Sequence, residues 1–345
     1  MLEDKDRTEL SELGEFGLID RIAKSVVLNQ KSTVKGIGDD AAVVGTGKKK
    51  TLISTDLLLE GIHFDLSYVP LKHLGYKAVA VNLSDIYAMN GKPTQITVSL
   101  GLSSRFPLEA IDELYTGILR ACDKYNVDLV GGDTTSSISG LTLSITAIGE
   151  ANEENIVYRN GAKETDLICV SGDLGAAYLG LQLLEREKAI FKDNPAVQPD
   201  LTGHDYVLER QLKPEPRADI IDILELEKVV PTSMIDVSDG LSSDLMHICT
   251  QSDVGCRIYI EKLPIDHTSA LAAEELNLDT TVCALNGGED YELLFTVDLK
   301  DYDRLKDNPA VRVIGHITDK SDGYNMVAGE QIIPLQAQGW KHLDS

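Results

Sequence analysis

The sequence has no long hydrophobic run. Crossing a bilayer requires roughly 18 to 20 consecutive apolar residues, and no segment of the chain approaches that length. The N-terminal stretch MLEDKDRTEL is charged and lacks the basic and then apolar layout of a signal peptide. We therefore expect a cytoplasmic protein with no membrane partner.

Cysteine is also scarce. The chain has five cysteines, an odd number, which are scattered along the sequence and include no C-x-x-C pair. This usage argues against a disulfide framework and against a zinc site. We expect buried free thiols at Cys122, Cys169, Cys249, Cys256 and Cys283.

Basic residues are few relative to acidic ones. Lys and Arg total 32 against 56 for Asp and Glu, which gives a formal net charge of −24. This charge makes nonspecific binding of nucleic acid through a basic surface unfavourable. If the ligand is nevertheless an anion, divalent metal ions must lie between it and the protein.

The length and the pattern of elements predict two domains. A chain of 345 residues exceeds the usual size of one domain, and its 43% hydrophobic and 26% charged residues are ordinary globular values. Strand and helix patterns alternate, and a second alternation begins near residue 166, so we predict an α/β (α+β) fold with domains 1–150 and 151–345. Residues 186–216 are polar and contain prolines, which predicts an insertion or surface excursion. In the first half the predicted strands and helices are 50–56, 72–90, 94–102, 107–125 and 141–151.

Five short acidic motifs lie among small residues, and we interpret them as turns. Four of them follow an apolar or tightly packed segment, where α/β folds gather their ligand sites. A simpler interpretation of NLSD and DVSDG is capping, because Ser and Asp at the opening of a helix accept from free N–H groups. The motifs are GIGDD (36–40), STD (54–56), NLSD (82–85), GGDTT (131–135) and DVSDG (236–240).

Taken together, the motifs favour a magnesium site. Mg²⁺ prefers oxygen ligands, commonly carboxylates, waters and phosphates, and several aspartates converging on one cleft without metal would repel one another. A polyphosphate would bring several such ions together, and the glycines at 131, 132, 172 and 175 allow its close approach to the backbone. The candidate carboxylates are those of Asp40, Asp56, Asp85, Asp133, Asp236 and Asp239, and Ser54 and Thr55 offer further oxygens.

The chain lacks the two common motif sets of nucleotide kinases. It contains no G-x-x-x-x-G-K-[ST] loop, and no H-R-D motif accompanied by D-F-G. A polyphosphate site in this chain therefore requires a third architecture.

Eight longer motifs occur in a fixed order along the chain. They are GEFGLI (14–19), GIGDDAAV (36–43), STDLLLEGIHF (54–64), YKAVAVNLSDIYAMNGKP (76–93), GGDTT (131–135), RNGAK (159–163), IDVSDGLSSDL (235–245) and GGEDYELLF (287–295). This series closely resembles thiamine-monophosphate kinase, and the resemblance extends from about residue 11 to Trp340. The family belongs to a group of ATP-using enzymes that includes aminoimidazole ribonucleotide synthetase, selenophosphate synthetase and a hydrogenase-maturation protein.

The resemblance implies a reaction and an architecture. The reaction is transfer of the γ-phosphoryl group of ATP to thiamine monophosphate, which gives thiamine diphosphate and ADP. The architecture is a two-domain fold like that of aminoimidazole ribonucleotide synthetase. In it, the N-terminal domain binds ATP and Mg²⁺ and pairs across a homodimer into a shared β-barrel, and the C-terminal domain completes the active site.

The resemblance also assigns roles to individual positions. Nucleotide contacts fall on Tyr115, Gly132, Asp133, Arg159 and Ser238. Positions facing the thiamine moiety are His63, Glu289 and Trp340. The ligands of several Mg²⁺ ions fall on Asp40, Ser54, Thr55, Asp56, Asp85, Asp133, Asp236 and Asp239.

Some of these residues also have simpler interpretations. Trp340, the only tryptophan, would serve as a packing anchor, although tryptophan is also the strongest cation–π partner for a thiazolium ring. His63 would be a packed or surface histidine, and Arg159 would pair with a surface acid. Asp39 and Asp290 adjoin favoured acids and are left without an assigned role.

The expected chemistry needs no covalent nucleophile. Phosphoryl transfer requires alignment and charge neutralisation, and metal ions that bridge the phosphates supply both. The attacking phosphate oxygen is already anionic near neutral pH, so we name no catalytic base.

Two other functions stay open. One is another synthetase of the same group, but selenophosphate synthetase would require a reactive Cys or selenocysteine near the N-terminus, and the first cysteine is Cys122. Aminoimidazole ribonucleotide synthetase acts on a ribonucleotide and has no evident need for the GIHF, GGEDYE and GW motifs. The other function is a non-catalytic sensor of nucleotide or thiamine phosphate, which would tolerate loss of aspartates that are all present here.

Overall fold

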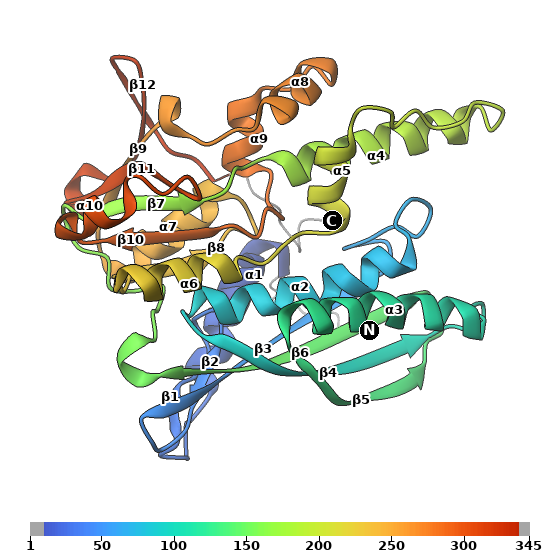
Figure 1. Cartoon of the computed structure of the whole chain (residues 1–345), viewed down its shortest axis with the longest axis horizontal. Coiled ribbons are helices and arrows are strands. Elements are labelled where there is room, and N and C mark those ends of the chain that lie inside the picture. The colour runs from blue at the N-terminus through green and yellow to red at the C-terminus, as the bar shows by residue number, and fades with distance from the viewer. Residues whose placement is uncertain (1–9, 338–345) are drawn as a thin grey trace, which may run out of the picture.

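The chain folds around two β-sheets (Figure 1). The structure is a computed structural model that describes residues 10–337, with side chains described from residue 14 onward. The first sheet has six strands in the order β1-β2-β3-β6-β4-β5, and the second has seven in the order β13-β12-β9-β11-β7-β10-β8. Ten α-helices accompany the sheets in the described part of the chain, so the expected mixed α/β fold is confirmed.

The first sheet is antiparallel except for the pairing of β4 with β5. Side chains of β6 alternate between buried and partly exposed along the strand, as expected for a sheet with one face on a core. Helices α2 and α3 cover that face (Figure 1). The elements of this half are α1 Leu10–Ser25, β1 Thr33–Lys35, β2 Ala42–Val44, β3 Lys49–Leu59, α2 Leu71–Ala88, β4 Lys92–Leu102, α3 Leu108–Tyr125, β5 Asp128–Ser136 and β6 Leu141–Asn152.

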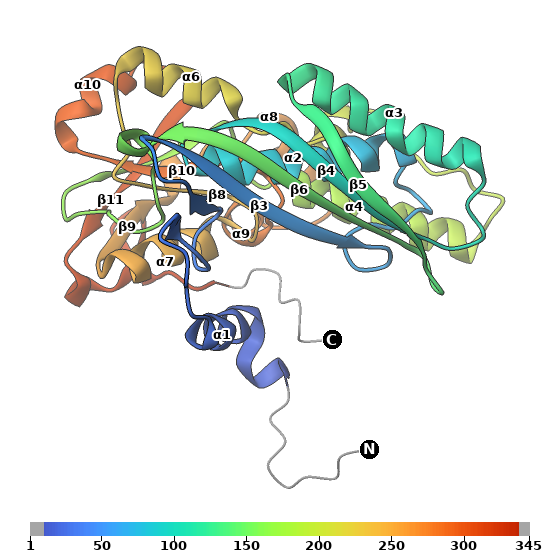
Figure 2. The ribbon, with the colours of Figure 1, turned by 90° about the horizontal axis from the view of Figure 1, so that it is seen from below.

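The opposite face of the first sheet is open in Figure 2, where its long strands lie in front of the helices. Leu57 on β3 is 52% exposed and Val130 on β5 is 57% exposed. Strand β5 forms the edge of this sheet, and its side chains are almost all exposed. Exposed apolar residues on an uncovered sheet face are typical of a contact surface.

The second sheet is antiparallel except for the pairing of β12 with β9. Its strands are β7 Leu167–Ser171, β8 Ser233–Asp236, β9 Gly255–Tyr259, β10 Leu293–Val297, β11 Val311–Thr318, β12 Tyr324–Ala328 and β13 Gln331–Pro334. Its helices are α4 Ala176–Asp193, α5 Asp205–Leu212, α6 Ala218–Glu227, α7 Leu241–Ser252, α8 His267–Glu275, α9 Thr280–Asn286 and α10 Tyr302–Leu305.

Helix α2 lies between the two sheets and is buried around its whole circumference. Fourteen of its eighteen residues are buried, because small and apolar residues fill nearly every position. One hydrophobic cluster includes Leu83 of α2, Ile221 of α6 and Phe295 of β10 together with the core of the first sheet. The two sheets therefore share a continuous core, and every polar side chain on α2 needs a partner.

The structure corrects the interpretation of three acidic motifs as turns. STD lies inside β3, where the ladder with β6 continues through residues 54–56. GGDTT lies inside β5, paired with β4. NLSD lies well inside α2, which begins at Leu71, so Ser84 and Asp85 do not open that helix or cap it. The prediction of helix capping by NLSD is therefore wrong.

The DVSDG motif does precede a helix, but no side chain caps that helix at its N-cap position. Helix α7 begins at Leu241 after Gly240. The carboxylate of Asp244, one turn into the helix, accepts a hydrogen bond from the amide of Gly240 at 3.1 Å.

Two further predictions were tested by the fold. All five cysteines are free and buried, as expected. The segment 186–216 is only in part a surface excursion, because it contains the end of α4 and all of α5, where Val207 and Gln211 are buried. No helix in residues 10–337 is long and apolar enough to cross a membrane.

Candidate active site

Three aspartates from distant parts of the chain meet between the two sheets. Asp40 precedes β2, Asp85 lies on α2, and Asp236 ends β8. One carboxylate oxygen of each lies within 4.8 Å of the others. Asp40 and Asp236 are buried and Asp85 is partly buried, so the structure brings three of the predicted metal ligands together. We call these three residues the aspartate cluster.

Burial and mutual repulsion raise the pKa values of these carboxyl groups and so disfavour their ionised forms. Burial, followed by the nearby charge of Asp40, raises the pKa of Asp236 from 3.8 to about 7. Burial, followed by the charges of Asp56 and Asp236, raises the pKa of Asp85 well above its usual value. The pKa of Asp56 rises to about 6, mainly through burial and then through the charge of Glu15. Carboxylates with raised pKa values are stabilised by binding either a proton or a metal cation.

Hydroxyl and amide groups orient the carboxylates. Ser84, one residue before Asp85 on α2, donates a hydrogen bond to Oδ2 of Asp236 at 2.7 Å. Ser54 on β3 donates to Oδ2 of Asp85. The amide of Asp56 donates to Oδ1 of Asn82 at 3.0 Å, which ties β3 to α2. These contacts explain why polar residues occupy a helix that is otherwise apolar.

Arg159 supplies positive charge at one side of the aspartate cluster. Its Nε and Nη2 atoms donate to Oδ1 of Asp40 at 3.1 and 2.5 Å. Oδ2 of Asp40 is buried and has no hydrogen-bond partner among the described residues. An unsatisfied buried carboxylate oxygen is costly, so this atom is well suited to a metal ion.

Asp39 supports Arg159. Its Oδ1 accepts the backbone amide of Arg159 at 3.1 Å, and its Oδ2 lies 3.2 Å from Nζ of Lys35. Burial, followed by the charge of Asp40, raises the pKa of Asp39. The structure therefore gives Asp39 a supporting contact, a role that the sequence left open.

The donor set fits a hard divalent cation. All groups at the aspartate cluster are oxygens, two of the three aspartates are buried, and one oxygen lacks a partner. Mg²⁺ takes such all-oxygen sites and usually completes its shell with water and phosphate oxygens. Asp239 lies three residues beyond Asp236 in the loop before α7, close enough in sequence to extend the set.

Other predicted ligands point elsewhere in the single chain. The hydroxyl of Thr55 donates to the carbonyl of Ile145 at 3.0 Å, and its exposed side chain faces away from that of Ser54 because consecutive residues of a strand face opposite sides. Asp133 is exposed on β5 and lines a hollow of about 330 Å³ with Leu57 and Ser144. Neither side chain joins the aspartate cluster.

The predicted nucleotide positions are dispersed. Tyr115 on α3 packs against the core of the first sheet. Gly132 on β5 has no room for a side chain, since an added Cβ would lie 1.7 Å from the carbonyl oxygen of Val98. Ser238 lies two residues after Asp236, and its carbonyl accepts a hydrogen bond from the amide of Glu289 at 2.7 Å.

The predicted thiamine-facing positions are partly described. His63 follows β3, and its Nδ1 accepts the amide of Leu59 at 3.0 Å, which places the proton of a neutral ring on Nε2. Glu289 lies in the loop before β10 and pairs with Lys77 at 3.0 Å. Trp340 lies outside the described residues.

The sequence did not single out a buried network behind the GGEDYE motif. Asp290 accepts the amide of Gly175 at 2.8 Å, at the start of α4, and Glu292 pairs with Arg210 at 2.8 Å. Asp290 therefore supports the fold. The one signal of this network in the sequence was the presence of three acidic residues within GGEDYE, because that many acids in a buried segment need polar partners.

Asp244 was also missed, although it is the second-last residue of the motif IDVSDGLSSDL. Its side chain is buried, and burial followed by the charges of Asp239 and Asp236 raises its pKa well above the usual value. Its position one turn after Gly240 was the available signal.

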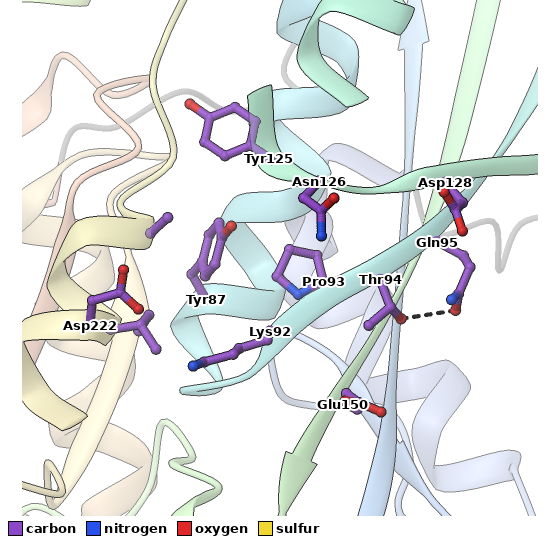
Figure 3. A pocket seen from close by; sticks show the side chains of 12 residues that line it. Tyr87, Lys92, Pro93, Thr94, Gln95, Tyr125, Asn126, Asp128, Glu150 and Asp222 are labelled. Atoms are coloured by element: carbon purple, nitrogen blue, oxygen red, sulfur yellow. Dashed lines mark hydrogen bonds between the residues drawn. The ribbon is translucent and has the colours of Figure 1, made fainter. Parts of the chain in front are cut away.

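A separate pocket of about 490 Å³ lies between α6 and the start of β4. Figure 3 shows Asp222 approaching it from one side and Gln95 and Asp128 from the other, with Tyr87 between them. None of the predicted site residues lines this pocket, so the aspartate cluster remains the candidate active site.

Comparison with known proteins assigns the chain to a family. A family model described as "AIR synthase related protein, N-terminal domain" matches residues 38–151. Thiamine-monophosphate kinase of Buchnera aphidicola is 37% identical over 342 residues, covering 96% of this chain and 99% of that protein. The Bacillus subtilis enzyme of that name is 34% identical, with the same shares covered. The chain belongs to the thiamine-monophosphate kinase family.

Solved structures agree with this assignment. A structure described as AaThiL complexed with AMPPCP and TMP is 33% identical, with a TM-score of 0.82, and the match covers 98% of this chain and 100% of that one. Thiamine-monophosphate kinase from Aquifex aeolicus is 31% identical, with a TM-score of 0.76 and coverage of 95% and 100%. The hydrogenase maturation protein HypE in complex with ATP shares the fold at 17% identity, a TM-score of 0.64 and coverage of 92% and 95%.

Removing one negative charge from the aspartate cluster should stabilise the metal-free protein. The substitution Asp236→Asn retains the hydrogen bond from Ser84 and removes the repulsion of Asp236 by Asp40 and Asp85. The folded-state pKa of Asp236 is about 7 against 3.8 for the free group, so ionisation costs the folded wild type stability as pH rises through this range. The advantage of the variant in free energy of unfolding should be absent below about pH 4, increase up to about pH 7 and then level off.

Urea unfolding in chelator-containing buffer measures this difference. The exposed Asp112→Asn is a matched control, and we expect no such trend for it. Addition of Mg²⁺ should raise the unfolding temperature of the wild type more than that of Asp236→Asn. A variant that is less stable than the wild type at pH 7 without metal would contradict the electrostatic account.

Proposed function

We propose that this chain catalyses ATP-dependent phosphorylation of thiamine monophosphate, giving thiamine diphosphate and ADP. The proposal rests on the buried aspartate cluster, found in a chain whose fold matches a structure complexed with AMPPCP and TMP at a TM-score of 0.82. Membership in the thiamine-monophosphate kinase family supports the same acceptor. The other synthetases of the group and a non-catalytic sensor have no comparable support.

The acidic residues would hold several Mg²⁺ ions. The aspartate cluster is the centre of this set, and Asp56 is close enough in space to raise the pKa of Asp85 through its charge. When bound, Mg²⁺ would neutralise charge on the phosphate oxygens and hold the two substrates in line. The remaining proposed ligands are Ser54, Thr55, Asp133 and Asp239.

The chain's own groups position the reaction. Arg159 holds Oδ1 of Asp40, and Oδ2 has no hydrogen-bond partner among the described residues, while Ser54 and Ser84 fix the carboxylates of Asp85 and Asp236. The acceptor phosphate is anionic near neutral pH, so no side chain has to remove a proton from it. Direct in-line transfer without a covalent enzyme intermediate follows from this arrangement.

Nucleotide and thiamine contacts complete the proposal. We assign the nucleotide to Tyr115, Gly132, Asp133, Arg159 and Ser238. We assign the thiamine moiety to His63, Glu289 and Trp340. The division into an ATP-binding domain, 1–150, and a domain completing the site, 151–345, is supported by the separation of strands β1–β6 from β7–β13 into two sheets.

An acceptor panel tests the reaction. Purified protein is incubated with ATP and Mg²⁺ and with thiamine monophosphate, aminoimidazole ribonucleotide precursor or selenide, and the products are resolved by chromatography. We expect thiamine diphosphate, and we expect Asp56→Asn to reduce turnover by about a hundredfold or more because a metal-facing charge is lost. Turnover of another acceptor alone would show that a different synthetase activity is correct.

Trp340 offers a second test of the thiamine position. Because it is the only tryptophan, its fluorescence reports on one residue. Addition of thiamine monophosphate should change this fluorescence, and Trp340→Ala should raise the KM for thiamine monophosphate by about tenfold through loss of a cation–π contact while changing the KM for ATP little. Equal changes in both KM values would instead indicate a packing role.

We further propose that two copies pair through the open face of the first sheet into a shared barrel. This is supported by the exposed edge strand β5, by exposed Leu57 and Val130, and by the hollow beside Asp133. Light scattering after size-exclusion chromatography should give twice the chain mass of 37.6 kDa.

Charged substitutions on this face test the pairing. Val130→Lys and Leu57→Lys should shift the protein to monomer, because they would place charge in an apolar contact. Leu226→Lys is a control, because Leu226 is 77% exposed on α6, away from this face. A monomeric wild type at micromolar concentration would contradict the pairing.

A further inference from the structure

Lys77 is a buried cation that the proposed chemistry does not use. It lies on α2 and is only 5% exposed. Lysine is almost never this buried unless its ammonium group is paired. Its partners should therefore reveal what the charge does.

Nζ of Lys77 joins two segments of the second half of the chain. It lies 3.0 Å from Oε1 of Glu289 and donates a hydrogen bond to the carbonyl of Gln211 at 3.0 Å. Nε2 of Gln211 donates to Oε2 of Glu289 at 2.9 Å. Both carboxylate oxygens of Glu289 are thus held, one from α2 and one from α5, while a third of its side chain surface stays exposed.

The loop that carries Glu289 has an unfavourable backbone conformation. Glu289 and Tyr291 have φ angles of 58° and 51°, in the left-handed region that side chains other than glycine seldom adopt. Such a conformation persists only where surrounding contacts impose it. The held carboxylate of Glu289 is one of these contacts.

The same loop lies against the turn that follows Asp236. The amides of Glu289 and Tyr291 donate to the carbonyls of Ser238 and Val237 at 2.7 and 2.9 Å. A Cβ on Gly288 would lie 2.6 Å from the carbonyl oxygen of Ser238, so the two segments approach each other closely. A shift of Glu289 would therefore be transmitted to the edge of the aspartate cluster.

Helix α2 spans the distance between the two ends of the site. Lys77 and Ser84 are seven residues apart, so they lie on the same side of the helix, about 10 Å apart along its axis. Ser84 holds Asp236 of the aspartate cluster, and Lys77 holds Glu289. One largely buried helix thus fixes the separation between the two carboxylates.

We propose that Lys77 is a positioning residue that sets the place of Glu289 for the cationic end of the acceptor substrate, at a fixed distance from the phosphate end. This inference rests on the proposed function. Lys77 touches neither the substrate nor the reacting phosphates; it acts through Glu289. Its removal should weaken binding of the phosphorylated organic cation and leave ATP binding nearly unchanged.

Steady-state kinetics of Lys77→Met test the inference. We expect the KM for thiamine monophosphate to rise about tenfold, the size expected for loss of one charge-assisted hydrogen bond, while the KM for ATP stays within about twofold. A variant in which both KM values rise equally, or neither rises, would overturn the inference. Lys50→Met is the matched control: Lys50 is also 5% exposed in the same half, but it pairs with Glu153, and no change in KM is expected.

A double substitution separates positioning from a general structural role. If Lys77 acts through Glu289, Lys77→Met combined with Glu289→Gln should have a KM for thiamine monophosphate within about twofold of Glu289→Gln alone. Effects that multiply would show that the two residues act independently and would overturn the inference.

A second variant covers the case in which Lys77→Met does not fold. Gln211→Leu removes the other donor to Glu289 and leaves Lys77 in place, and we expect a smaller rise of a few fold in the same KM, measured on protein whose thermal unfolding matches the wild type. Unchanged KM in this variant would count against the inference. If the wild-type protein forms no thiamine diphosphate, the proposed function and this inference are both overturned. If the wild type turns over normally but the variants do not raise the KM for thiamine monophosphate selectively over that for ATP, the inference alone is overturned.

Discussion

Repulsion among the carboxylates of Asp40, Asp85 and Asp236 is the constraint on which the rest of the structure depends. Three negative groups within 4.8 Å of one another cannot all be ionised in a buried site without a compensating cation. The fold answers this in two ways: Arg159 neutralises one side, and serine hydroxyls on β3 and α2 orient the other two groups. The strong negative charge of the whole chain fits the same solution, because metal ions, not basic side chains, would meet the phosphates.

Much of this could be predicted from the sequence because it depends on local residue patterns. The strands and helices of the first half follow hydrophobic periodicity, and the aspartates stand out because they lie among small residues. Resemblance to a family then supplied roles that no local pattern contains, such as those of Tyr115 and His63. Finding the aspartate cluster required both the sequence pattern and the fold. The pattern identified the acidic residues, and only the fold showed that Asp40, Asp85 and Asp236 meet while Asp133 lies on the open face.

The failures have a common physical origin. Ser84 and Asp85 were interpreted as the opening of a helix because Ser and Asp can accept from the free N–H groups of a first turn, yet here they lie inside the helix and tertiary contacts satisfy them. GGDTT was interpreted as a turn because its acid lies among small residues, whereas pairing with β4 places it in a strand. The role of Lys77 could not be predicted, since both of its partners, Gln211 and Glu289, lie more than a hundred residues away in the sequence.

The continuous core between the two sheets also bears on how such a protein can change over time. Leu83, Ile221 and Phe295 come from three distant segments but pack in one cluster. A substitution that alters volume in one half must be matched in the other, because interiors are packed too closely to absorb it. The two halves are therefore poor modules for recombination: a hybrid gene joining halves of two diverged relatives would combine surfaces that never adapted to each other. Such hybrids should be viable only when α2 and the residues of α6 and β10 in the same cluster derive from the same parent.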